Sequence, residues 1–252
     1  MTETIRNGAL YIISTPIGNL DDISRRALGI LGAVDVVAAE DTRKSGFLLD
    51  HYSIRKPLLS YHGYNERRRA PELIRRLKEG QSVAVVTDAG TPGISDPAAV
   101  VIRDAIAEGI PVIPVPGASA LLAALVVSGL PTERFAFEGF LPVKKGRNTR
   151  LEQLKNEDRT IVLYESPHRL GRTLEDLFAR LGDRRVAVVR EVTKKFEEIV
   201  RGSLSDVITR LRQKAARGEY VIVLEGRSGV RDNDETEALE SLTSSPRVNR
   251  HA

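Results

Sequence analysis

Residues 83–97 read Val-Ala-Val-Val-Thr-Asp-Ala-Gly-Thr-Pro-Gly-Ile-Ser-Asp-Pro. The four apolar residues at the start have the length of a short buried strand, and the rest contains two glycines, two prolines and two aspartates. Glycine permits a positive φ and proline fixes φ, so a connection of this composition has a defined shape. We expect its backbone to contact a small ligand, and Asp96 and Pro97 to cap and begin the next helix.

The same succession of a short apolar run, a loop and a helix-like segment recurs through the first half of the chain. Apolar runs lie at residues 10–13, 34–39, 83–86 and 112–115, and segments with helical spacing lie at 23–31, 66–78 and 97–108. Apolar strands that alternate with helices are typical of a parallel sheet covered on both faces. We therefore predict an α/β fold whose N-terminal part is a mostly parallel, Rossmann-like sheet.

A second series of elements follows the helix-like segment 119–128 and the sequence Gly129-Leu130-Pro131, which indicates a domain boundary. Strands are expected at 135–141, 160–164, 186–190, 197–202 and 220–225, and helices near 168–181 and 204–217. Part of this series alternates polar and apolar residues, which favours a mixed sheet flanked by helices. We predict an N-terminal domain at 8–130, a C-terminal domain at 131–226 and a disordered tail at 227–252.

The composition excludes several kinds of site. The 252 residues include no cysteine, which rules out disulfides, thiol catalysis and cysteine-bound metal centres, and the four histidines are too scattered for a recognisable metal motif. We therefore expect no metal. Lysine and arginine number 38 against 34 acidic residues, and this net charge of +4 suits an anionic partner such as RNA without requiring one.

The longest apolar run, residues 120–127, is shorter than the roughly 20 residues of a membrane span. The first residues also lack the basic and apolar stretches of a signal peptide. We expect a cytoplasmic protein with no membrane segment.

Ligands of open α/β sheets bind beyond the carboxyl ends of the strands, so the loops at those ends are candidate sites. Three such loops besides 87–97 stand out, at residues 14–20, 39–43 and 115–120. The first has two readings, a ligand contact or an ordinary turn, and it does not match the glycine fingerprint of dinucleotide-binding folds. In the second loop, Asp41 or Thr42 caps a helix, or a carboxylate accepts a proton beside Arg43.

Charged stretches in the second half also have two readings each. The cations between Lys144 and Arg150 form either a solvated loop or a phosphate-contacting patch. In the sequence 164–169, Ser166 and Pro167 are ordinary helix-start residues, whereas His168 and Arg169 would project from a helix N-terminus that attracts anions. Residues 190–198 form either a charged hairpin or an edge that faces the substrate.

Taken in chain order, eight stretches resemble the tetrapyrrole-methylase, or class III, superfamily of S-adenosylmethionine methyltransferases. They are TPIGNLDDIS, AEDTR, YHGYNE, TDAGTPGISDP, VPGASA, FEGFLP, YESPHR and EVTKKFEE, and the resemblance covers the chain from Thr15 to about Glu225. Within the superfamily, the chain is most similar to bacterial enzymes that methylate the 2′-hydroxyl of a cytidine ribose in the decoding region of 16S ribosomal RNA.

The resemblance implies a bilobed fold with S-adenosylmethionine in the cleft, a homodimer, and 16S rRNA or the small ribosomal subunit as substrate. Family-like donor contacts would fall on Pro16, Gly18, Asp88, Gly90, Ile94, Ser119 and Ala120. Two other functions stay open: a sibling methyltransferase that acts on a tetrapyrrole or another small molecule, and a noncatalytic RNA-binding factor in ribosome assembly.

Methyl transfer to a ribose hydroxyl requires a group that accepts the hydroxyl proton. The candidates are Glu40, Asp41, Lys194 and His168. The proposed phosphate or transition-state contacts are Arg43, Lys144, Arg147, Arg169 and Lys195. Tyr61, Tyr64 or Phe140 would stack on a base, although packing is the commoner fate of such aromatic side chains.

Overall fold

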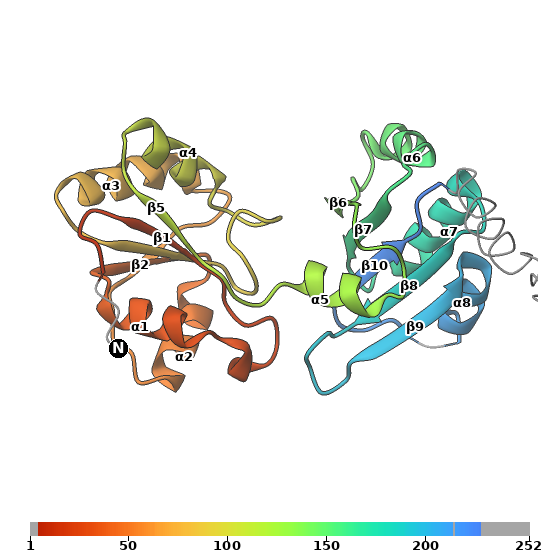
Figure 1. Ribbon diagram of the computed structural model, residues 1–252, viewed down its shortest axis with the longest axis horizontal. Helices are drawn as coiled ribbons and strands as arrows, with labels where there is room; N and C mark the ends of the chain where they lie inside the picture. Colours follow the sequence, from red (N-terminus) through yellow and green to blue (C-terminus); the bar gives the residue numbers. More distant parts are fainter. Residues whose placement is uncertain (1–4, 214, 228–252) are drawn as a thin grey trace, which may run out of the picture.

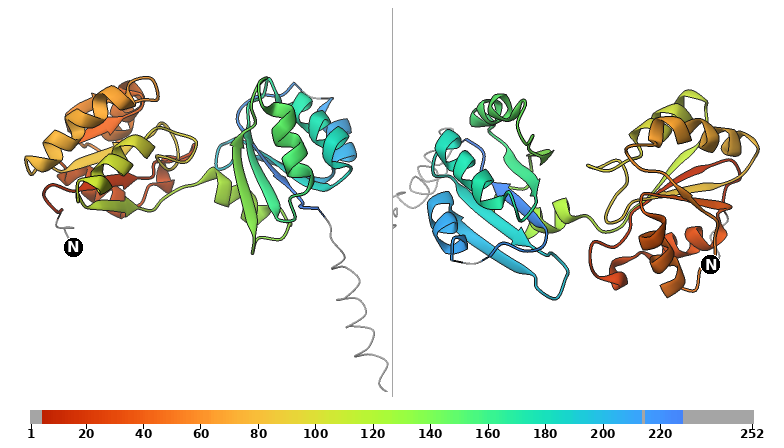
Figure 2. Two further views of the ribbon diagram at one scale, coloured as in Figure 1. Left: turned by 90° about the horizontal axis from the view of Figure 1, so that it is seen from above. Right: turned by 180° about the vertical axis from the view of Figure 1, so that it is seen from behind.

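The computed structural model describes residues 5–213 and 215–227, and these form two lobes that lie side by side along the long axis of the molecule (Figures 1 and 2). Each lobe contains one five-stranded sheet. Apart from Arg227, the tail expected at 227–252 lies outside the described residues.

The N-terminal sheet is entirely parallel, with the strand order β3-β2-β4-β1-β5. Its strands are β1 (Leu10–Ile13), β2 (Val36–Ala39), β3 (Leu58–Ser60), β4 (Val83–Val86) and β5 (Val112–Val115). The predicted α/β class and parallel sheet are therefore confirmed. The sequence pattern did not predict β3, a three-residue strand at the sheet edge.

Helices cover both faces of this sheet, as the apolar strands require. One face carries α1 (Arg25–Ala33) and α2 (Thr42–His51), and the other carries α3 (Glu66–Lys78) and α4 (Ala99–Ala107) (Figure 1). A short 3-10 turn, η1 (Leu20–Asp22), precedes α1. The strands β1, β2 and β4 are fully buried between the two helical layers.

The strand order creates a switch point between the central strands β1 and β4. From β1 the chain crosses through α1 to β2 on one side, and from β4 it crosses through α4 to β5 on the other side, over the opposite face. The loops that leave these two strands therefore diverge and open a crevice at the carboxyl ends of the strands.

Two backbone hydrogen bonds join the loops at the switch point. The N–H of Thr15 donates to the carbonyl of Gly90 (2.9 Å), and the N–H of Gly90 donates to the carbonyl of Thr15 (3.1 Å). Gly90 has a φ of +86°, which a residue with a Cβ rarely adopts. The glycine of loop 87–97 thus holds that loop against loop 14–20.

The C-terminal sheet is mixed, with the order β6-β7-β10-β8-β9, as predicted. Its strands are β6 (Phe135–Phe140), β7 (Thr160–Glu165), β8 (Arg185–Arg190), β9 (Glu198–Ser203) and β10 (Tyr220–Leu224). The pair β6 and β7 is parallel, and the other three pairs are antiparallel. The helices α6 (Arg147–Lys155), α7 (Leu170–Leu181) and α8 (Leu204–Leu211) cover one face.

The other face of the C-terminal sheet is covered by α5 (Ala120–Val127), which lies between the lobes in Figure 1. Its buried residues Ala124 and Leu125 pack with Val162 and other side chains of that sheet. The border expected at residue 130 assigns this helix to the first domain. Both faces of the first sheet are already covered, so the apolar helix α5 packs on the second sheet. The chain therefore passes from the first lobe to the second at residues 116–119, before α5 begins.

The start of α4 differs from the prediction. The helix begins at Ala99, its N-cap residue is Ala98, and within the described residues no side chain caps it. Asp96 does not cap the helix as predicted, because the helix begins three residues later and the Asp96 carboxyl lines a cavity instead.

Two further helices differ from the sequence pattern. Helix α6 begins in the cation-rich run after Gly146, and α8 ends at Leu211 instead of residue 217. Among the helices that the structure describes, none is both long and apolar enough to cross a membrane.

Candidate functional site

Two adjoining cavities lie at the carboxyl ends of β1, β2 and β4. The inner cavity, about 410 Å³, is lined by both lobes and by the start of α5, including Glu40, Asp96, Ser119 and Tyr164. The outer cavity, about 690 Å³, is lined by loop 14–20 and α2 and closed on one side by residues of the second lobe. Both volumes are within the range of small-ligand sites. The cavities share Ile17, Lys44, Asp88, Ala89, Lys194 and Glu219.

Glycines allow the two lobes to approach each other beside these cavities. A Cβ on Gly18 would overlap the side-chain carbons of Lys194, which belongs to the second lobe. A Cβ on Gly139, at the bulge in β6, would lie 3.0 Å from the Oγ of Ser95 in loop 87–97. These close approaches make the inner cavity a site between lobes.

Three carboxylates of the first lobe line the inner cavity, those of Glu40, Asp88 and Asp96. The Oε2 of Glu40 accepts the Thr87 hydroxyl at 2.5 Å and the backbone N–H of Asp88 at 3.3 Å. Burial raises the pKa of Asp96 to about 6, and the nearby charges of Glu40 and Asp88 add to this effect. The pKa of Asp96 is therefore closer to neutral pH than that of an ordinary aspartate.

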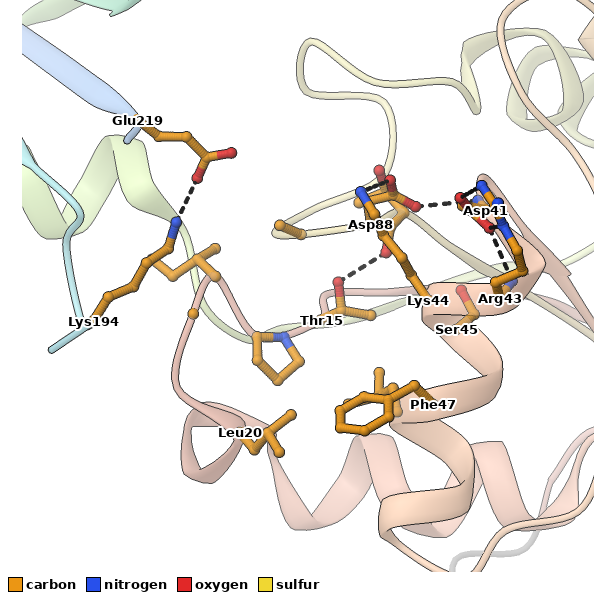
Figure 3. Close-up of a pocket in the computed structure, with 16 residues that line it drawn as sticks. Thr15, Leu20, Asp41, Arg43, Lys44, Ser45, Phe47, Asp88, Lys194 and Glu219 are labelled. Carbon is orange, nitrogen blue, oxygen red and sulfur yellow. Dashed lines mark hydrogen bonds and ion pairs between the residues drawn. The ribbon is translucent and has the colours of Figure 1, made fainter. Parts of the chain in front are cut away.

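Lys194 stands at the wall shared by the two cavities and is a cation. Its Nζ lies 2.9 Å from Glu191 and 2.8 Å from Glu219, and the Lys194–Glu219 pair faces Asp88 across the outer cavity (Figure 3). Burial lowers the pKa of Lys194, but the bonds and charges of the two carboxylates outweigh burial and raise it. The predicted role of Lys194 as a proton acceptor needs a neutral amine, so this arrangement contradicts it.

Asp41 has the helix-capping role that the sequence allowed. Its carboxylate accepts the N–H of Arg43 at 2.9 Å and pairs with the Arg43 guanidinium at 3.1 and 2.7 Å. The hydrogen bonds from Arg43 hold the pKa of Asp41 well below its usual range, so Asp41 is a weak proton acceptor. Next to it, Lys44 pairs with Asp88 at 2.7 Å, and Asp88 also accepts the N–H of Asp41.

The residues expected to contact a methyl donor are brought together around the cavities. The inner cavity is lined by Asp88, Gly90, Ile94, Ser119 and Ala120, and the outer cavity by Pro16, Gly18 and Asp88. The Ser119 hydroxyl caps α5 through the N–H of Leu122 at 3.5 Å. The four loops that the sequence singled out therefore meet at one place.

Two of the arginines predicted to contact RNA instead form hydrogen bonds and ion pairs within the second lobe. Arg147 is 4% exposed, and its guanidinium donates to Asp176, Thr173 and the carbonyl of Pro142, at 2.8, 2.9 and 3.2 Å. Arg169 bonds the carbonyl of Leu141 and pairs with the buried Glu165. Arg147 has no surface from which to reach a phosphate, so that expectation was wrong.

The remaining candidates lie at the surface or in the core. His168 is exposed and lies outside the described linings of both cavities, and Lys144 and Lys195 are exposed. Tyr61 is buried, and its hydroxyl accepts the N–H of Val101, so its predicted stacking role was wrong. Tyr64 is fully exposed, and Phe140, 53% exposed, lines the inner cavity.

Several residues that line the cavities were not predicted from the sequence. Lys44 directly follows a motif that was singled out, whereas Glu219 lies in a loop without any motif. Asp96 lines the inner cavity, whereas its place before Pro97 predicts a helix cap. Among residues 5–213 and 215–227, no group of three or more potential ligands is placed to hold a metal ion.

A family model described as Tetrapyrrole (Corrin/Porphyrin) Methylases matches residues 9–208. This chain belongs to the tetrapyrrole methylase family. A relative named Ribosomal RNA small subunit methyltransferase I, from Halalkalibacterium halodurans, is 46% identical over 237 residues, which cover 94% of this chain and 82% of the relative. A protein of the same name from Thermotoga maritima is 49% identical over 220 residues, 87% of this chain and 99% of the relative.

A solved structure supports the tetrapyrrole methylase fold. Uroporphyrin-III C-methyl transferase from Thermus thermophilus, complexed with S-adenyl homocysteine, superposes with a TM-score of 0.61 at 20% identity and covers 86% of this chain and 97% of its own. At this identity the likeness concerns the fold alone.

Replacing Asp96 with asparagine is expected to stabilise the protein most above pH 6. The folded wild type favours the protonated carboxyl of Asp96. The stability that this protonated carboxyl contributes is complete below the ordinary pKa of 3.8 and is lost as the pH rises through about 6. A shift of this size corresponds to roughly 3 kcal/mol, and we expect about 1 kcal/mol because solvent screens the half-buried group.

Urea unfolding of the wild type and Asp96→Asn at several values between about pH 5 and about pH 8 measures this difference. A difference in unfolding free energy that stays constant over this range would show that Asp96 does not titrate there.

Proposed function

We propose that this protein is an S-adenosylmethionine-dependent methyltransferase that acts on the 2′-hydroxyl of a cytidine ribose in the decoding region of 16S rRNA. The observation that carries the proposal is the convergence of the four motif loops on one inner cavity, in a chain whose relatives are named for methylation of small-subunit ribosomal RNA. The choice of ribose and nucleotide follows the sequence resemblance.

The inner cavity suits the proposed methyl donor. Ser119 and Ala120, which line the inner cavity, are small and leave room for a flat adenine ring. Bound S-adenosylmethionine supplies an activated methyl group. The part of this chain is to orient that group toward the acceptor and to exclude water, and alignment of this kind supplies much of a rate enhancement.

Glu40 is the proposed proton acceptor for the ribose hydroxyl. It lies in the inner cavity, and the Thr87 hydroxyl and the N–H of Asp88 orient its carboxylate. Asp41 is paired with Arg43, Lys194 is cationic, and His168 lies outside the cavities, so the geometry supports Glu40 over the other three candidates.

The exposed cations Arg43, Lys144 and Lys195 are the proposed RNA contacts. Arg43 is 89% exposed, and Lys195 lies beside the exposed ring of Phe196, with its Nζ 5.8 Å from the ring centroid. Phosphate contacts of this kind give affinity, and contacts to bases give specificity.

We also propose a homodimer that works in the cytoplasm, where its ribosomal substrate is assembled. Leu122 and Val126 lie one turn apart on the free side of α5 and are 51% and 71% exposed. Such a pair on an apolar helix is typical of a surface that a second subunit covers.

Small ribosomal subunits from cells that lack this gene provide the direct test. With labelled S-adenosylmethionine, the purified protein is expected to transfer the label to one cytidine ribose of 16S rRNA, located by mass mapping of the RNA. Transfer to a tetrapyrrole but not to RNA would replace this function with that of a small-molecule methyltransferase. Binding of the donor without turnover on any ribosomal particle would indicate a noncatalytic assembly factor.

The variant Glu40→Gln is expected to lower kcat by about 10²- to 10⁴-fold, the usual effect of removing a general base, while the Kd for the donor changes little. Glu79→Gln is the matched control, because it makes the same carboxylate-to-amide change at an exposed residue of the first lobe that lines neither cavity. If the two variants lose activity equally, Glu40 is not the proton acceptor.

The variant Gly90→Val is expected to weaken donor binding at least about tenfold, because valine at a φ of +86° strains the loop that lines the inner cavity. Gly80 has the same φ in a turn remote from the cavities, so Gly80→Val introduces the same kind of strain without touching the site. Calorimetry on both variants separates the effects, and equal donor affinities would remove Gly90 from the site.

A further inference from the structure

The outer cavity has an apolar floor that the proposed donor site does not use. Leu20 and Phe47 lie at this floor, and Leu48 also lines the cavity (Figure 3). The Phe47 side chain is 67% exposed, although it belongs to a helix whose other face packs in the core. A large aromatic surface exposed inside a cavity is characteristic of a binding site.

The charges around this floor cancel. Among the described residues that line the outer cavity, three are acidic and three are cationic: Asp41, Asp88, Glu219, Arg43, Lys44 and Lys194. Each acid pairs with one of the cations, at distances between 2.7 and 2.8 Å. A cavity with paired charges and an aromatic floor fits a neutral, flat ring better than a phosphate group.

The position of the cavity fits the acceptor side of a methyl transfer. Asp88, Lys44 and Lys194 belong to the lining of both cavities. A nucleoside whose base lies on the floor of the outer cavity therefore has its ribose near this shared wall, on the side of the inner cavity. Arg43 also lines the outer cavity, and its side chain is 89% exposed.

We propose that the outer cavity receives the nucleobase of the target nucleotide, unstacked from single-stranded RNA and packed on the ring of Phe47. The proposal rests on the proposed function, since it names the acceptor subsite of that reaction. Unpaired bases that stack on aromatic side chains are the usual means by which proteins recognise single-stranded RNA.

The absence of tryptophan from the 252-residue sequence gives a direct test. Phe47→Trp introduces a unique fluorophore at the floor of the cavity, and an oligocytidylate is expected to quench its emission in a saturable way. An abasic ribose-phosphate oligomer and S-adenosylhomocysteine are expected to leave the emission unchanged. Phe178→Trp is the control, because Phe178 is 41% exposed on α7, remote from both cavities.

Quenching by S-adenosylhomocysteine and not by the oligocytidylate would assign the cavity to the donor and overturn the proposal. Equal quenching by the abasic oligomer would assign it to the RNA backbone, and equal quenching of Phe178→Trp would show nonspecific binding. Each of these outcomes is read without any methylation assay.

Activity gives the second readout. Phe47→Ala is expected to lower kcat/KM for small ribosomal subunits by about 5- to 100-fold, the usual effect of losing one stacked base, and Phe47→Tyr is expected to retain activity. The Kd for the donor stays unchanged in both variants, and their thermal melts show that they fold. If the wild type methylates subunits but Phe47→Ala is fully active and Phe47→Trp is not quenched, the nucleobase site is refuted and the proposed function stands. If the wild type does not methylate RNA, the proposed function fails, and the fluorescence result alone decides the nucleobase site.

Discussion

The two hydrogen bonds between Thr15 and Gly90 hold together the region on which both cavities depend. They join the loops after β1 and β4, the two central strands from which the chain departs in opposite directions. Each loop contributes to the inner and the outer cavity, so the positions of Ile17, Asp88 and Asp96 relative to one another follow from this bridge. Without it, the loops at the switch point would be separate turns and not two walls of one site.

Ion pairs decide which charged residues are free to take part in chemistry. Asp41 and Lys194 carry the residue types expected of a proton acceptor, but each is bound to groups of opposite charge that favour its ionised form. Asp96 has no partner of opposite charge among the described residues and is half-buried beside another carboxylate. Its pKa is therefore raised, whereas that of Asp41 is lowered. Two carboxyl groups of one lobe thus behave differently because of their surroundings.

The second lobe contains a buried polar network beneath the sequence YESPHR. Glu165 is 2% exposed, accepts the Thr173 hydroxyl at 2.6 Å and pairs with Arg169, while Arg147 also donates to Thr173. Buried charges persist where they are paired and hydrogen-bonded, and removal of one partner is strongly destabilising. The motif therefore fixes the conformation of the lobe wall that faces the inner cavity, and Tyr164 at the end of the same strand lines that cavity.

The sequence by itself determined the α/β class, the parallel sheet of one lobe and the mixed sheet of the other, and the loops that carry the site. Short apolar runs and turns rich in glycine and proline are local signals, which can be read without knowing the contacts between distant residues. The sequence could not determine that α5 packs on the second sheet, that Arg147 is buried, or that Asp96 faces a cavity instead of capping α4. Those facts depend on contacts between residues far apart in the chain, such as Arg147 with Asp176 and Leu125 with Val162. Only the tertiary structure decided them, since burial and charge pairing arise when the layers pack together.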